Sequence, residues 1–154
     1  MKILNAFLAM CLLVISAGVS AESTDGDKPI DIVVYRSPSC GCCGKWLEHL
    51  KENNFNVEDV ITNDVQAIKD KYGVTREMAS CHTAIVDGYV VEGHVPASDI
   101  KTLLKTKPKV VGTAVPGMPS GTPGMEMGGK KEPYNVMSFD REKHYQIFNS
   151  YKGE

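Results

Sequence analysis

Three cysteines fall within four consecutive positions, Cys40-Gly41-Cys42-Cys43, and their thiols are the side chains in this chain best suited to chemistry. Cys40 and Cys43 form a C-x-x-C pair directly after an apolar, β-branched segment, where a helix is expected to begin. Unpaired backbone N–H groups and the helix dipole stabilise a thiolate at a helix start. Cys40 and Cys43 are therefore candidate catalytic residues for thiol redox chemistry.

Cys81 is the expected partner of this motif. In thioredoxin-like proteins, which carry a C-x-x-C pair at the same place, the strand after the second helix opens with a cis-proline. The residue before that proline faces the pair. Aligning residues 83–86 with that strand puts His82 at the proline position and Cys81 just before it. By this analogy of topology, we expect four sulfur atoms to converge at one end of the sheet.

Thiolates that lie close together either form disulfides or bind a soft metal ion. A structural disulfide suits an exported protein, but adjacent cysteines pair poorly and one thiol would need a distant partner. Structural zinc sites normally use two separate short Cys/His motifs, whereas the adjacent Cys42 and Cys43 suit the bridging of several ions. Soft thiolate and thioether ligands select Cu(I), so copper is the favoured metal.

Residues 110–129 could add thioether ligands to such a site. This segment contains six Gly, three Pro and three Met, with no helical or strand period beyond its first two residues. A structureless loop of this length in a small domain is usually functional or disordered. Met118 and Met125 are candidate copper ligands and Met127 is a weaker one, although a lid over an apolar cleft would also use Met.

Neutral imidazole is a competent copper ligand, and two of the four histidines lie near the other candidates. His82 adjoins Cys81 and is a candidate ligand. His94 follows the expected hairpin and is either a ligand or the cap of the next helix. His49 lies on the polar side of the first expected helix, where we expect it to face solvent.

The elements that position these residues alternate between strand and helix. Residues 30–35 read as a buried strand, and Ser39 is the expected N-cap of a helix that runs to about Asn54. Two late strands are expected at residues 134–139 and 145–148. Between the first helix and these late strands, we expect a strand at 56–61 and a helix capped by Asn63 or Asp64 and ended by Gly73. A hairpin around Asp87-Gly88 and a helix after Pro96 follow.

This order predicts an α/β fold with a thioredoxin-like central mixed sheet flanked by helices. The Met/Gly/Pro-rich loop and the C-terminal strands would be additions to that core. We expect residues 22–154 to form a single copper-binding domain, with its core at about residues 30–139.

Residues 1–21 have the order of a secretory signal peptide. Lys2 precedes an uncharged run, and small residues close the run at Val19-Ser20-Ala21. The run is short for a membrane anchor and its flank is acidic, so we expect export and cleavage after Ala21. The remaining 133 residues hold 16 basic and 19 acidic side chains. This balance argues against nucleic acid as a partner, and no second apolar run could span a bilayer.

The sequence resembles the CopG-type copper-resistance proteins, a family of exported thioredoxin-like domains, over about residues 30–139. Four motifs carry the resemblance: Ser39-Cys40-Gly41-Cys42-Cys43, Ser80-Cys81-His82-Thr83-Ala84, Gly88-Tyr89-Val90-Val91-Glu92-Gly93-His94-Val95-Pro96, and Val115-Pro116-Gly117-Met118-Pro119 with Gly124-Met125-Glu126. The resemblance implies a periplasmic copper-binding protein in which copper gathers as a thiolate-bridged cluster at the C-x-C-C motif. It also implies a redox role in copper detoxification.

Carried over residue by residue, the resemblance implies one set of ligands. The sulfur ligands become Cys40, Cys42, Cys43 and Cys81, with His94, His82, Met118 and Met125 as flanking candidates. Met127 lies outside the matching motif.

The leading hypothesis is therefore a periplasmic copper-resistance protein that binds Cu(I), as several ions, and cycles its thiols between metal-bound and disulfide states. Its partners would be copper ions and other periplasmic copper-handling proteins. One alternative is a thiol-disulfide oxidoreductase or isomerase acting on exported proteins, with Cys40 as the attacking thiolate. Another is a passive exported domain with two structural disulfides.

Overall fold

The computed structural model describes residues 28–126 and 128–153 of the 154-residue chain. The expected signal peptide and Met127 lie outside the described residues, so the predictions made for them stay predictions. Within the described ranges, no helix is long and apolar enough to cross a membrane.

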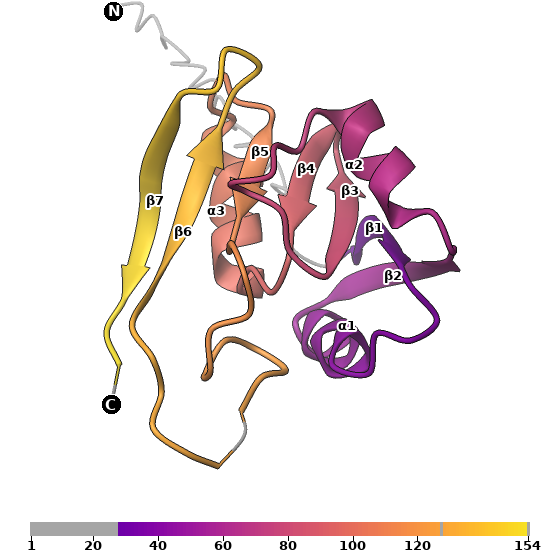
Figure 1. Cartoon of the computed structure of the whole chain (residues 1–154), viewed down its shortest axis with the longest axis vertical. Coiled ribbons are helices and arrows are strands. Elements are labelled where there is room, and N and C mark those ends of the chain that lie inside the picture. Colours follow the sequence, from indigo (N-terminus) through magenta and orange to yellow (C-terminus); the bar gives the residue numbers. More distant parts are fainter. Residues whose placement is uncertain (1–27, 127, 154) are drawn as a thin grey trace, which may run out of the picture.

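Strands of one mixed sheet alternate with helices over the first two thirds of the described chain (Figure 1). The sheet order is β2-β1-β3-β4-β5-β6-β7. β1 pairs in parallel with β2 and β4 pairs in parallel with β5, whereas the other neighbours are antiparallel. The elements are β1 (Ile30–Arg36), α1 (Cys43–Glu52), β2 (Phe55–Ile61), α2 (Val65–Tyr72), β3 (His82–Val86), β4 (Tyr89–Glu92), α3 (Ala97–Thr106), β5 (Gly112–Ala114), β6 (Tyr134–Phe139) and β7 (Tyr145–Tyr151).

The sheet is covered on both faces, because alternate residues of each strand point to opposite sides. On one face, Trp46 and Leu50 of α1 and Ile100 of α3 pack into a single apolar cluster with the strands. A second cluster on the other face includes Tyr72 at the end of α2 and Met78 in the following loop. This helix–sheet–helix arrangement confirms the predicted thioredoxin-like α/β fold.

Local sequence signals set several boundaries as predicted. The Asp64 carboxylate accepts a hydrogen bond from the backbone N–H of Ala67 and caps α2, and Gly73 ends the helix at φ +75°. The hairpin between β3 and β4 turns at Asp87 and Gly88, which have φ values of +45° and +80°. Both turn residues are in the left-handed conformation that a tight hairpin turn requires.

Two of the expected features were wrong. Ser39 does not cap α1: Cys42 is the N-cap residue, with no side-chain cap, and the Ser39 hydroxyl bonds that of Ser37 instead. The expected structureless loop also contains a short strand, β5, which pairs with β4 and β6. Since Gly112 and Ala114 carry almost no side chain, β5 has no apolar alternation by which sequence reading could detect it.

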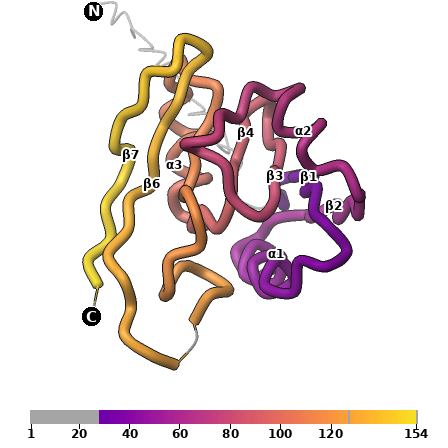
Figure 2. The backbone as a smooth tube through the Cα atoms, in the orientation of Figure 1, coloured from indigo at the N-terminus to yellow at the C-terminus, as the bar shows by residue number. Residues whose placement is uncertain are grey.

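The rest of that loop, residues 115–133, connects β5 to β6 and passes close to α1 (Figure 2). A Cβ atom at Gly124 would lie only 2.7 Å from the backbone nitrogen of Trp46 in α1. Gly124 also has a φ of +83°. Glycine at this position therefore lets the loop pack directly against the backbone of α1.

Candidate metal centre

The four cysteines gather at one end of the sheet, as the topology predicted. One ligand atom from each of Cys40, Cys42, Cys43 and Cys81 lies within 4.8 Å of the others, and we call this group the cysteine cluster. Cys40 and Cys43 form a disulfide, and Cys42 and Cys81 are free thiols. The described residues thus contain one disulfide and not the two that a passive, doubly stapled domain needs.

The sheet register brings the two halves of the cysteine cluster together. β1 ends at Arg36, and Arg36 pairs with His82, the first residue of β3. The loop after β1 carries Cys40 and Cys42, and the residue before β3 is Cys81. Because β1 and β3 are antiparallel neighbours, the end of one and the start of the other lie side by side.

The Met-containing loop contributes one sulfur beside the cysteine cluster. The Cys42 thiol donates a weak hydrogen bond to the Met118 thioether, with their sulfur atoms 3.8 Å apart. Met118 is 51% exposed, unusually open for a large apolar side chain. Met125 is half-buried, and its described hydrogen bonds are those of its backbone with Gly121 and Thr122. The structure therefore places the Met118 thioether in contact with a cluster thiol.

Two buried imidazoles extend the donor set inward. Cys81, His82 and His94 offer ligand atoms that all lie within 4.8 Å of one another. The Cys81 sulfur is 3.2 Å from Nδ1 of His82, and Nδ1 of His94 is 2.7 Å from the Pro123 carbonyl oxygen. Nε2 of both histidines is buried with no hydrogen-bond partner in the described structure. Such unpartnered buried nitrogens are costly, and a bound metal ion would satisfy them.

The aromatic side chain of Trp46 packs beside these imidazoles. Its ring centroid is 4.3 Å from that of His82, and its indole N–H donates to the carbonyl of Val95 at 2.9 Å. Burial lowers the pKa of His82 well below its ordinary value, and burial also lowers that of His94. Both rings are therefore neutral at neutral pH, the state in which imidazole binds a metal.

Burial shifts the pKa of the neighbouring Cys81 thiol in the opposite direction. It raises the pKa of Cys81 to about 11, while the contact between the sulfur and the Ser80 hydroxyl partly opposes that rise. The free thiol is thus protonated at neutral pH, and a metal ion must displace its proton to bind. The donor set as a whole, thiols with one thioether and two neutral imidazoles, fits a soft ion such as Cu(I).

Two solved structures are similar to this chain over most of its length. "Copper resistance protein copG- Form 2" is 44% identical, with a TM-score of 0.77, over 80% of this chain and 99% of the solved chain. "Copper resistance protein copG- Form 1" is 45% identical, with a TM-score of 0.77, over 82% of this chain and 100% of the solved chain. The chain belongs to the CopG copper-resistance family.

Two further comparisons complete this result. Residues 78–125 of this CopG-family chain match a protein family described as "Protein of unknown function, DUF411". That match includes Cys81, His94 and Met118 but not the C-x-C-C motif. A comparison with curated proteins found no match.

One histidine of the CopG-family chain was placed wrongly from sequence. His49 is half-buried, and its Nε2 accepts a hydrogen bond from the backbone N–H of Ala97 at 3.1 Å. The His49 side chain thus caps α3, a role we considered for His94. Burial lowers the pKa of His49, which keeps Nε2 free to accept. The sequence pattern places His49 only on the polar side of its own helix, so it could not predict this contact with α3.

The sequence also gave no signal of a buried ion pair behind Cys81. Lys69 of α2 and Glu92 at the end of β4 are in contact, and their side chains are 7% and 0% exposed. Charged side chains are rarely buried in this way unless paired. Lys69 lies in an expected helix as a charged residue, and Glu92 lies at the end of an apolar hairpin strand, so neither position predicts a buried partner.

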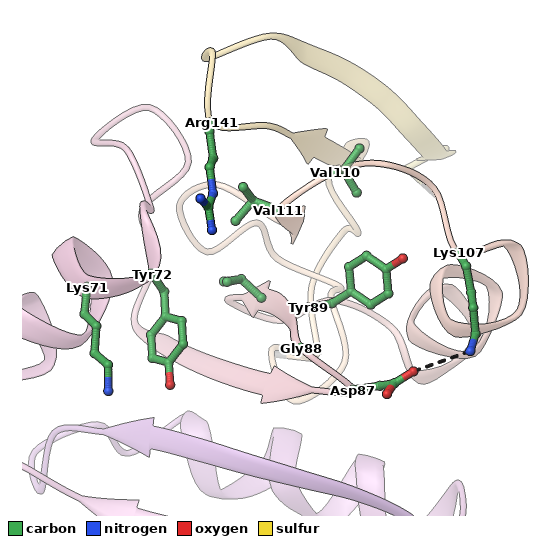
Figure 3. A pocket seen from close by; sticks show the side chains of 10 residues that line it. Lys71, Tyr72, Asp87, Gly88, Tyr89, Lys107, Val110, Val111 and Arg141 are labelled. Atoms are coloured by element: carbon green, nitrogen blue, oxygen red, sulfur yellow. Dashed lines mark ion pairs between the residues drawn. The ribbon is translucent and has the colours of Figure 1, made fainter.

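A surface hollow of about 430 Å³ lies elsewhere, at the hairpin end of β3 and β4 (Figure 3). Figure 3 shows Arg141 pointing into it and Lys107 at its rim, where the Lys107 ammonium is 3.8 Å from the Asp87 carboxylate. Its lining includes no Cys, His or Met. The cysteine cluster lies away from this hollow, because Cys81 directly precedes the opposite end of β3.

Proposed function

We propose that this CopG-family protein confers copper resistance by binding Cu(I) as a thiolate-bridged, multinuclear cluster at Cys40, Cys42, Cys43 and Cys81. The observation that carries the proposal is the convergence of these four ligand atoms within 4.8 Å of one another. A thiolate sulfur can bridge two metal ions, so four sulfurs at this spacing can hold several ions, and soft thiolate ligands favour Cu(I).

Three further side chains would complete the cluster. His82 and His94 offer buried nitrogens without partners, and Met118 places a thioether 3.8 Å from Cys42. Met125 is a further candidate ligand through the family resemblance, and Met127 is a weaker one. We assign His82, His94 and Met118 as the flanking ligands.

The disulfide gives the site a redox partner for copper. A Cys40–Cys43 disulfide that accepts one electron from each of two Cu(I) ions becomes two thiolates and leaves two Cu(II) ions. The reverse reaction takes two electrons from the thiolates and reduces two Cu(II) ions to Cu(I). Either direction balances with copper and cysteine alone, so we propose that the thiols alternate between a disulfide and a copper-bound form.

Anaerobic titration of the fully reduced protein with Cu(I), against a chromophoric Cu(I) chelator, tests the binding proposal. We expect more than one Cu(I) ion to bind per chain. Replacing Cys42 or Cys81 by Ser is expected to lower the stoichiometry, because each serine removes a bridging sulfur. A Ser39→Ala variant is the matched control, since Ser39 lies beside the motif but donates no sulfur. Binding of one ion or fewer per wild-type chain contradicts the proposal.

The proposed site of action is the periplasm, supported by the signal-peptide pattern of residues 1–21. Mass spectrometry of the chain recovered from a periplasmic extract tests this, with an expected mature N-terminus at Glu22. Other periplasmic copper-handling proteins are the proposed partners in copper delivery.

The disulfide at the start of α1 also favours an alternative, a thiol-disulfide oxidoreductase or isomerase acting on exported proteins. An insulin-reduction assay with a Cys40→Ser control separates the two functions. Copper binding without turnover supports the copper-resistance proposal, and robust turnover in the absence of copper supports the enzyme.

A further inference from the structure

The segment that presents Cys81 is held by a buried carboxylate. The Glu92 side chain accepts a hydrogen bond from the backbone N–H of Ser80 at 2.6 Å and one from the Thr83 hydroxyl at 2.7 Å. Ser80 comes just before Cys81, and Thr83 comes two residues after it. One carboxylate therefore fixes the chain on both sides of the Cys81-His82 pair.

Glu92 is itself fixed by a buried cation. The Lys69 ammonium contacts the carboxylate and donates to the Thr83 hydroxyl at 3.0 Å, so that it bridges α2 to both strands of the hairpin. Thr83 and Glu92 are also direct cross-strand partners in β3 and β4. Each oxygen of the Glu92 carboxylate thus has at least one donor, and the carboxylate is held in the position where it accepts from the Ser80 N–H.

Ser80 joins this network to the Met-containing loop. Its hydroxyl donates to the carbonyl of Gly117, which directly precedes Met118. A Cβ atom at Gly93 would lie 2.5 Å from the Ser80 hydroxyl oxygen, so glycine there allows Ser80 to pack against the end of β4. The position of Ser80 therefore affects both Cys81 and Met118.

Stability does not explain why this ion pair is buried. Desolvating two charges offsets much of their attraction, and apolar replacements of similar volume often leave stability unchanged or raise it. The carboxylate does supply something that an apolar side chain lacks, an acceptor for the Ser80 N–H. Without this acceptor, the half-buried Ser80 N–H would draw the Ser80-Cys81 segment toward water.

We propose that Glu92, oriented by Lys69, is a positioning residue that holds Cys81 in the cysteine cluster through the Ser80 N–H. The copper-binding consequence rests on the proposed function, whereas the placement of Cys81 does not.

The first test needs no metal. In a Cys42→Ser background, with the Cys40–Cys43 disulfide intact, Cys81 is the single free thiol of the described chain, and its alkylation rate by iodoacetamide reports its placement. We expect a Lys69→Met/Glu92→Leu variant to alkylate at least about tenfold faster, the effect of losing one charge-assisted hydrogen bond, while its unfolding midpoint in urea stays the same or rises. Alkylation at the unchanged rate overturns the proposal.

A rescue variant separates the hydrogen bond from the charge. Lys69→Met/Glu92→Gln keeps an amide oxygen that can accept from Ser80 N–H, so its alkylation rate should stay near that of the parent. Lys107→Met, which breaks the exposed ion pair with Asp87 at the other end of β3, is the matched control and should change nothing. If the glutamine variant alkylates as fast as the leucine variant, the positioning role is wrong.

A wild-type measurement covers the case in which the leucine variant does not fold. Amide hydrogen exchange should show the Ser80 N–H protected at least about 100-fold relative to an exposed loop amide, as expected for an N–H bonded to a buried carboxylate. Exchange of Ser80 at the unprotected rate overturns the proposal.

Copper titration then links the positioning to function. With the cysteines otherwise intact, the leucine variant should bind Cu(I) at least about tenfold more weakly than wild type, and the glutamine variant should not. If the wild-type protein binds no Cu(I), the proposed function fails while the alkylation result still decides the placement of Cys81. Equal Cu(I) affinity of the leucine variant and wild type overturns the role of Glu92 in the copper site.

Discussion

A methyl group at Gly93 should displace the segment that carries Cys81. Gly93 lies between the end of β4 and His94, with a φ of +72°. A Cβ atom there would be 2.5 Å from the Ser80 hydroxyl oxygen, 2.7 Å from the Ser80 Cβ and 2.7 Å from the Val115 carbonyl oxygen. The last contact is with backbone, so it cannot be relieved by rotating a side chain. A Gly93→Ala substitution must therefore move Ser80, Val115 or both.

Two costs add in this variant. Holding a non-glycine residue in the left-handed region costs about 1–2 kcal/mol. Forcing a methyl group into packed surroundings costs about 1–3 kcal/mol more. We therefore expect Gly93→Ala to lower the free energy of unfolding by about 2–5 kcal/mol, measured by equilibrium urea unfolding of the metal-free protein.

Gly88→Ala isolates the backbone term. Gly88 has a φ of +80°, but a Cβ atom there would meet no atom within 4 Å. This control should lose about 1–2 kcal/mol from backbone strain alone, and its Cu(I) affinity should equal that of wild type. The excess loss in Gly93→Ala then measures the steric contact, and a fall in Cu(I) affinity measures its effect on Cys81. Equal destabilisation by the two substitutions would refute this reasoning.

Three further outcomes are expected. The folded protein holds His49 neutral, with its pKa below the ordinary value of about 6.5, so stability from this group is present above that pH and is lost as the pH falls through the folded pKa. His49→Gln, which keeps an acceptor for Ala97 N–H, should flatten this part of the pH dependence in urea unfolding at pH 5 to 7. His49→Ala should lower the free energy of unfolding by about 1 kcal/mol at pH 7, because the cap is lost. Identical pH profiles for wild type and His49→Gln would show that the cap does not titrate. Met118→Leu should weaken Cu(I) binding in chelator competition while Met137→Leu, on the other face of the sheet, should not, and equal effects would remove Met118 from the site. Cu(I) affinity should rise with pH between 6 and 8 because each bound thiol releases a proton. The slope should be smaller in Cys81→Ser, because that variant lacks a thiol whose pKa is raised to about 11 in the wild-type protein. An unchanged slope in Cys81→Ser would mean that Cys81 loses no proton when copper binds.

Local signals predicted most of the core of the fold. The Asp87-Gly88 turn, the Asp64 cap and the Gly73 stop are each determined by residues close in sequence, and all three are confirmed. The convergence of Cys81 with the C-x-C-C motif was also predicted, because the order of strands and helices constrains which strand ends meet.

Features that depend on long-range packing could not be predicted in this way. β5 exists because Gly112 fits against the Val90 backbone, where a Cβ atom would lie 1.9 Å from the Val90 oxygen, and its own residues show no strand pattern. His49 caps a helix 48 positions away in sequence. The ion pair between Lys69 of α2 and Glu92 at the end of β4 is a third case. Helical periodicity would leave Lys69 exposed, and it cannot identify a strand residue as its partner.

X-ray absorption at the copper edge tests the central claim most directly. The fully reduced chain, loaded anaerobically with Cu(I) and freed of excess metal, should hold more than one copper ion per chain and show sulfur scattering together with short Cu–Cu scattering. Cu–Cu scattering arises only if thiolates bridge neighbouring ions. One ion or fewer per chain, with sulfur ligands and no Cu–Cu scattering, would contradict the cluster.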